Sequence, residues 1–106
     1  MRDDPVRVAD MRESLERIRG FVAGGRAAFF SDAKTHEAVA YEVLKLGEAA
    51  GHISVYFRRR HPEVPWKRLA ALRNEIVHEY FRVDLESLWQ FVEAEMGVLE
   101  DGLRGL

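Results

Sequence analysis

The sequence predicts an all-α fold, an up-down four-helix bundle formed by a single domain over residues 1–106. Two observations carry this prediction. Apolar residues recur every three or four positions through four long segments, and no segment alternates apolar and polar residues as a strand would. A length of 106 residues also suits one small domain with a single core.

The first helix should begin at Asp4-Pro5, since an N-cap acceptor followed by proline is typical of a helix start. Its apolar stripe is formed by Val8, Met11, Leu15, Ile18 and Val22. Gly24-Gly25 should end this helix. Residues 26–30 are expected to be a short connector to the second helix.

The second helix should be capped by Ser31 or Asp32. Its apolar stripe consists of His36, Val39, Val43, Leu46, Ala50 and Ile53. Gly47 costs about 1 kcal/mol of helix propensity relative to alanine, which predicts that another helix approaches closely there. Ser54 should start a short extra helix, which ends before Pro62 and Pro65.

The third main helix should open at Pro65-Trp66 and run through Tyr80, because apolar residues recur at helical spacing and neither glycine nor proline interrupts them. Arg82-Val83 is expected to be a short break. Asp84 should cap the fourth helix, with Glu86 in its first turn. The buried stripe of that helix is expected to be Leu85, Leu88, Trp89, Val92, Met96, Leu99 and Leu103.

Composition excludes several classes of protein. Hydrophobic residues make up 47% and charged residues 32%, which indicates a globular protein rather than a disordered segment. No apolar run approaches the roughly 20 residues that span a bilayer, and no signal peptide is evident, so we expect a cytoplasmic protein without a membrane partner. A net charge of −2 argues against non-specific coating of long nucleic acids.

Four polar residues on the predicted third helix stand out: Arg73, Asn74, His78 and Tyr80. On a continuous helix Tyr80 would lie almost in line with Arg73, and Asn74 and His78 would share a neighbouring stripe. A permanent cation, an amide, a group that titrates near neutrality and a phenol suit the binding and cleavage of a phosphodiester.

The pattern Arg73-x-x-x-x-His78-x-Tyr80 resembles the signature of the HepT-like toxins of the HEPN (higher eukaryotes and prokaryotes nucleotide-binding) superfamily. The surrounding residues strengthen this resemblance, which covers roughly residues 5 to 103. They are His61 to Trp66, Asn74, Glu79 and Phe81, with Gly47-Glu48-Ala49 earlier in the chain and Asp84-Leu85 and Trp89 later. The resemblance implies a HEPN-like bundle that acts as a metal-independent endoribonuclease, with its site composed across a homodimer.

Metal-independent RNA cleavage needs a base for the 2′-OH proton, an acid for the leaving 5′-oxygen and a cation for the charged phosphorane. His78 suits proton transfer and Arg73 suits phosphate stabilisation. One chain supplies one motif histidine, whereas a dimer supplies two. Arg73 and His78 would also lie about 140° apart on one straight helix, which favours a cleft between two copies. We therefore expect the second and third main helices near the two-fold axis.

The resemblance also implies a partner. Toxins of this family are paired with small nucleotidyltransferase (MNT-type) antitoxins, which can transfer AMP from ATP to the motif tyrosine, here Tyr80. An adenylyl group there would place a bulky anion beside Arg73 and compete with RNA phosphate.

Further residues have weaker assignments. Glu48 either supports Arg73 across the helix interface or is a solvated glutamate, and Asn74 either orients His78 or caps a backbone group. Arg58-Arg59-Arg60 either suits a helix C-terminus or guides RNA, with Lys67 and Arg68 adding to it. The four histidines lack metal-ligand spacing and no glycine-rich phosphate loop is present, so we predict no bound metal or cofactor.

Two other functions compete with a nuclease. The chain could be a non-catalytic HEPN module that binds a nucleotide or docks onto a nucleotidyltransferase. It could also be a plain helical dimerisation protein, but that leaves Arg73, His78 and Tyr80 without a role.

Overall fold

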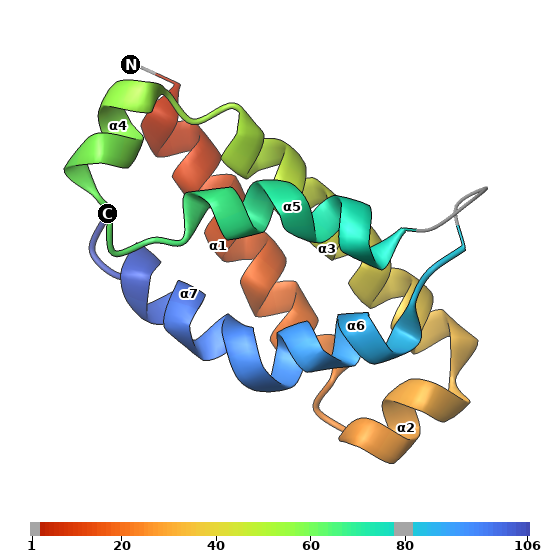
Figure 1. The fold of residues 1–106 in the computed structure, drawn as a ribbon. Coiled ribbons are helices and arrows are strands. Elements are labelled where there is room, and N and C mark those ends of the chain that lie inside the picture. The colour runs from red at the N-terminus through yellow and green to blue at the C-terminus, as the bar shows by residue number, and fades with distance from the viewer. Residues whose placement is uncertain (1–2, 78–81) are drawn as a thin grey trace.

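The computed structural model describes residues 3–77 and 82–106, and within these ranges every regular element is a helix apart from one isolated bridge (Figure 1). The predicted all-α fold is confirmed. In chain order the helices are α1 (Asp4–Phe21), α2 (Arg26–Ser31), α3 (Ala33–Gly51), α4 (Val55–Arg60), α5 (Trp66–Ile76), α6 (Leu85–Gln90) and α7 (Met96–Leu103).

Helix α3 lies at the centre of the bundle. It packs along α1 on one side and along α5 on the other, while α6 and α7 cross the bundle and close the core (Figure 1). The predicted apolar stripe of α3 is buried from Val39 to Ile53, and only His36 at its start stays half-buried. No helix in the described part of the chain is both long and apolar enough to cross a lipid bilayer.

Three of the predicted helix starts are confirmed by their capping bonds. Asp32, Ser54 and Asp84 each accept a hydrogen bond from a backbone N–H in the first turn of α3, α4 and α6, at 3.1 Å in all three cases. Such a bond satisfies one of the N–H groups that a helix start leaves without a partner. The short extra helix before the third main helix is therefore present as α4.

The expected connector at residues 26–30 is wrong, because these residues form helix α2. The junction from α1 to α2 requires a left-handed backbone at Gly25 (φ 91°), a conformation that glycine adopts without steric cost. Phe29 of α2 is fully buried and its ring contacts Trp89 at 5.1 Å between centroids. A short helix was missed because two adjacent phenylalanines show no periodicity.

The fourth main helix contains one wider turn. Residues Phe91–Glu95 are π-helical and join α6 to α7. Phe91, the first residue of this turn, is buried beside Val92 and is only 1% exposed. The predicted stripe did not include Phe91, although it follows the buried Leu88 by three positions.

Helix α5 ends earlier than predicted. Its last residue is Ile76, and Val77 is extended (φ −100°, ψ 114°) and forms an antiparallel bridge with Val83. The Asp84 N–H donates to the Ile76 carbonyl at 2.7 Å, so the chain is held together on both sides of the connection. Helical rotation therefore cannot be used to relate Arg73 to His78 and Tyr80.

Helix α1 begins at Asp4 with Asp3 as its N-cap residue, one position earlier than predicted. The buried Asp4 carboxylate instead accepts hydrogen bonds from the Ser54 N–H (2.9 Å) and the Ser54 hydroxyl (2.7 Å). Burial alone would raise the pKa of Asp4, but the pKa lies below its usual value, and the two hydrogen bonds from Ser54 are the largest causes that lower it. Asp4 thus ties the start of α1 to the start of α4.

We expect Asp4→Asn to lower the free energy of unfolding by about 1–2 kcal/mol at pH 7, because the hydroxyl of Ser54 loses its carboxylate acceptor. A lowered native pKa contributes stability above the unfolded pKa of about 3.9, and that stability is lost as the pH falls through the native pKa. The difference between wild type and variant should therefore narrow below about pH 4. Urea unfolding across this pH range measures it, with the exposed Asp10→Asn as the control. A pH-independent difference would contradict the assignment.

Candidate functional site

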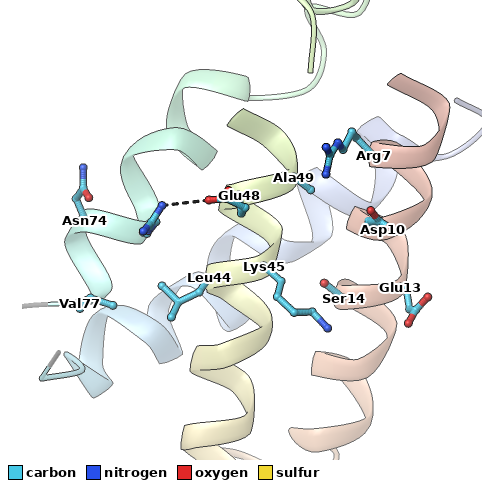
Figure 2. A pocket seen from close by; sticks show the side chains of 11 residues that line it. Arg7, Asp10, Glu13, Ser14, Leu44, Lys45, Glu48, Ala49, Asn74 and Val77 are labelled. Carbon is cyan, nitrogen blue, oxygen red and sulfur yellow. Dashed lines mark hydrogen bonds and ion pairs between the residues drawn. The ribbon is translucent and has the colours of Figure 1, made fainter. Parts of the chain in front are cut away.

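Arg73 and Asn74 lie on the last turn of α5, and both side chains are exposed. The Arg73 Nη1 donates to Glu48 Oε2 on α3 at 3.2 Å, so the predicted support of Arg73 by Glu48 is present (Figure 2). The side chains of Arg73 and Glu48 are 56% and 58% exposed, and a pair so open to solvent contributes little to stability. The bond therefore fixes the direction of the guanidinium more than it holds the fold.

The close approach of α3 and α5 explains why these two side chains meet. A Cβ atom on Gly47 would lie 3.4 Å from the Leu69 carbonyl oxygen and 3.5 Å from the Arg73 Cβ. The bare backbone of α3 thus faces α5 at this turn, and Glu48 follows directly in the sequence. The predicted packing role of Gly47 is confirmed, although both distances are those of ordinary contact, so alanine would also fit.

Glu48 has a second partner. Its Oε1 lies 3.2 Å from Nε2 of His52, one turn further along α3. The carboxylate therefore bridges an imidazole and a guanidinium, and Arg73 keeps its remaining N–H donors for another ligand. Sequence reasoning did not single out His52, although its spacing of four from Glu48 is a contact distance on a helix.

A groove of about 580 Å³ begins at these residues and crosses α3 to α1 (Figure 2). It is lined by Arg7, Asp10, Glu13, Ser14, Leu44, Lys45, Glu48, Ala49, Arg73, Asn74 and Val77. The contribution of α1 was missed, although Arg7, Asp10 and Ser14 recur three and four apart and so share one polar face.

The structure brings together only part of the predicted site. Arg73, Asn74 and Glu48 meet at the groove, whereas His78 and Tyr80 lie outside the described residues. The predicted hydrogen bond between Asn74 and His78 therefore stays a prediction. Within residues 3–77 and 82–106, no three His, Asp or Glu side chains gather as a metal ion would require.

The basic run Arg58 to Arg60 lies in the last turn of α4, where cations suit the helix dipole, and it does not line the groove. Arg58 donates to the Gly51 carbonyl at 3.3 Å, and Arg60 donates to the Tyr56 hydroxyl at the same distance. These contacts agree with the alternative in which the three arginines suit a helix C-terminus. Binding of RNA by this run stays a prediction.

Arg68 was expected to extend that basic run, but it is engaged with carboxylates. It binds Glu95 through two hydrogen bonds, at 2.6 and 2.8 Å, and also pairs with Glu75. The hydrogen bonds that Arg68 donates to Glu95 are the largest cause that raises the pKa of Arg68 above its usual value. Arg68 therefore links α5 to the π-helical turn and is not an open cation.

The comparison with known families matches residues 11–105 to the family described as "Ribonuclease HepT-like". The chain belongs to the HepT-like ribonuclease family. This match covers nearly the whole chain and includes every predicted site residue, and it confirms the resemblance drawn from the Arg73 to Tyr80 pattern.

Curated relatives agree with this HepT-like assignment. "Probable ribonuclease HepT" of Thermococcus cleftensis is 36% identical over 92 residues, which cover 86% of this chain and 84% of that protein. "Putative RNase MJ1380" of Methanocaldococcus jannaschii is 32% identical, covering 83% and 84%. "Putative RNase TTE0752" of Caldanaerobacter subterraneus subsp. tengcongensis is 31% identical, covering 81% and 74%. No solved structure matches the chain.

We expect Glu48→Gln to change the free energy of unfolding by less than about 0.5 kcal/mol, because the Arg73–Glu48 pair is exposed. Arg68→Gln should cost about 1–2 kcal/mol, because its bonds to Glu95 are more buried. Chemical denaturation compares the two variants. A large loss for Glu48→Gln would show that this pair holds the fold together rather than orienting Arg73.

Proposed function

We propose that this HepT-like chain is a metal-independent endoribonuclease, the toxin of a HEPN/MNT toxin–antitoxin pair, and that it cleaves RNA at a site shared by two copies of the chain. The observation that carries the proposal is the exposed Arg73 guanidinium, held through one nitrogen by Glu48 at the edge of a groove. Family membership supplies the ribonuclease chemistry that this arrangement would serve.

Each residue has one role in this proposal. Arg73 neutralises the charge that develops on the phosphorane, because its planar fork matches two phosphate oxygens. His78 transfers protons, since an imidazole titrates close to neutral pH. Glu48 orients Arg73, and Asn74 orients His78. Val77, which precedes His78 in the sequence, lines the groove, and this supports placing the proton-transfer step there.

Two proton transfers support a homodimer, because each copy contributes one motif histidine. The exposed surface of α3 next to the groove also suits a partner. Tyr41 is 61% exposed there, and Leu44, which lines the groove, is half-buried. We place the two-fold axis near α3 and α5. The 140° separation of Arg73 and His78 no longer supports this arrangement, since α5 ends at Ile76.

A non-catalytic HEPN module is the second candidate. The groove lies within one chain, and its volume of about 580 Å³ falls within the range of about 300–1,000 Å³ that is typical of small-molecule pockets. A nucleotide phosphate could then bind Arg73 without being cleaved. Substitution of His78 separates the two functions.

We expect His78→Ala to abolish RNA cleavage, with a loss of at least about 100-fold, because general acid–base catalysis contributes about that much or more. Growth arrest on expression should disappear as well. Binding of a 2′-O-methylated RNA, which cannot be cleaved, should persist because Arg73 remains. If wild type and variant are equally inert while both bind a nucleotidyltransferase partner, the non-catalytic module replaces the enzyme.

Mixed dimers provide the control for a shared site. When His78→Ala protein is exchanged into the wild type, cleavage should fall with the square of the wild-type fraction, because both histidines of one cleft are needed. A linear fall would mean that each copy works alone. Sedimentation at micromolar concentration gives the dimer population, and a clean 12.2 kDa species would contradict the dimer.

We expect Tyr80 to accept AMP when the chain is co-expressed with an MNT-type nucleotidyltransferase. The phenolic oxygen would attack the α-phosphate of ATP, losing its proton and releasing diphosphate. Mass spectrometry should find the added AMP on the peptide that contains Tyr80, with Tyr80→Phe as the unmodified control, and cleavage should fall in proportion to the modified fraction. Absence of AMP on Tyr80 would exclude this mode of control.

A further inference from the structure

The groove continues well beyond Arg73, and its far half carries two more cations, Arg7 on α1 and Lys45 on α3 (Figure 2). We propose that Arg7 and Lys45 form a second subsite for the RNA backbone, where they contact phosphates further along the strand than the one held by Arg73. This subsite rests on the proposed nuclease function, but it makes a separate prediction about binding.

Geometry separates the two subsites. Helices α1 and α5 lie on opposite sides of α3, so Arg7 and Arg73 approach the groove from different helices. A nucleic-acid strand lying in the groove, with a charge at every nucleotide, can contact both.

In the far half of the groove, Arg7 is the cation that has no carboxylate partner among the described residues. Its side chain is half-buried in the groove wall, and among residues 3–77 and 82–106 no carboxylate lies within ion-pair distance of its guanidinium. Arg73 and Lys45, by contrast, each already contact a glutamate. An arginine without a carboxylate keeps all of its N–H donors for a phosphate oxygen.

The Lys45 ammonium contacts a carboxylate that does not line the groove. Its Nζ lies 3.2 Å from Glu42 Oε1, and the Glu42 side chain is only 4% exposed and does not line the groove. The Nζ also lies 5.1 Å from the centre of the Tyr41 ring. This contact is an ion pair without hydrogen-bond geometry, so the three donors of the ammonium stay available to a ligand. The buried carboxylate therefore positions Lys45 without occupying the groove.

Carboxylates that line the same groove allow a stricter test of the proposed subsite. Glu13 is paired with Arg17 at 2.6 Å, whereas Asp10, one turn beyond Arg7 on α1, is exposed in the groove and opposes an incoming phosphate. Removing the charge of Asp10 should strengthen RNA binding, and removing that of Arg7 should weaken it. A role of this surface in folding alone would not give opposite signs.

The test measures fluorescence anisotropy of a labelled single-stranded RNA of about ten nucleotides, 2′-O-methylated so that it cannot be cleaved, between about 50 and 200 mM salt. Arg7→Gln should flatten the slope of log K against log salt by about 0.7, the value for one phosphate contact on a single strand. Affinity at the lowest salt should fall several-fold. Asp10→Asn should bind more tightly than wild type.

Two further variants serve as controls. Arg104→Gln removes the same charge from an exposed site on the far end of the chain and should leave the slope unchanged. Lys45→Gln should flatten the slope like Arg7→Gln, but it also removes one of the two cations beside the buried Glu42, the other being Arg17 at 3.8 Å. Lys45→Arg keeps the charge and should keep the slope, and circular dichroism confirms that each variant is folded.

The outcomes distinguish this subsite from the nuclease itself. If wild type cleaves RNA, Arg7→Gln should raise KM and leave kcat unchanged. If wild type does not cleave but Arg7→Gln still flattens the slope, the nuclease fails and the subsite stands. An unchanged slope overturns the subsite even in an active nuclease. A loss of dimer in Arg7→Gln with no change in slope would also overturn it, because the groove would then be an interface between copies.

Discussion

The contact between α3 and α5 at Gly47 is the constraint on which the site depends. Because Gly47 has no side chain, the Leu69 carbonyl and the Cβ atom of Arg73 pack directly against its backbone. The next residue of α3, Glu48, then reaches the Arg73 guanidinium at 3.2 Å. A bulky side chain at position 47 would separate the helices and break this bond, although neither exposed partner contributes much to stability.

The two arginines of α5 lie in different environments. Arg68 forms two hydrogen bonds to Glu95 and one to Glu75. The side chains of Arg68 and Glu95 are each about a third exposed or less, and their bonds join α5 to the helices that cross it. Arg73 has one solvent-exposed partner and otherwise faces the groove. In the proposed nuclease, a cation that binds and releases phosphate suits the second environment, because the charge of Arg68 is already balanced by two carboxylates.

Periodicity and capping chemistry predicted most of the bundle, since burial of a stripe and satisfaction of N–H groups are local demands. Asp32, Ser54 and Asp84 cap the helices as expected. The misses arose where tertiary contacts override the local pattern. Phe29 is buried against Trp89 from a helix too short to show a period, and Phe91, at the start of the π-helical turn, is buried beside the predicted stripe. The site was predicted from a motif that begins on α5, so the α1 wall of the groove, which only folding brings close to α5, was not predicted.

The early end of α5 matters more for function than for the fold. A helix continued through Tyr80 would have fixed the motif residues by rotation alone. Instead Val77 is extended, bridges Val83 and lines the groove, while Asp84 closes the connection through the Ile76 carbonyl. The backbone therefore leaves α5 at the groove, and the hydrogen bond from Asp84 to Ile76 fixes it again before α6 begins. Arg73 is held by a rigid helix and contacts a carboxylate, and Val77 and Val83 fix the two ends of the connection that follows. In the proposed nuclease, the group that stabilises charge would therefore lie on a regular element directly before that connection, as is common where a rigid scaffold carries a reactive loop.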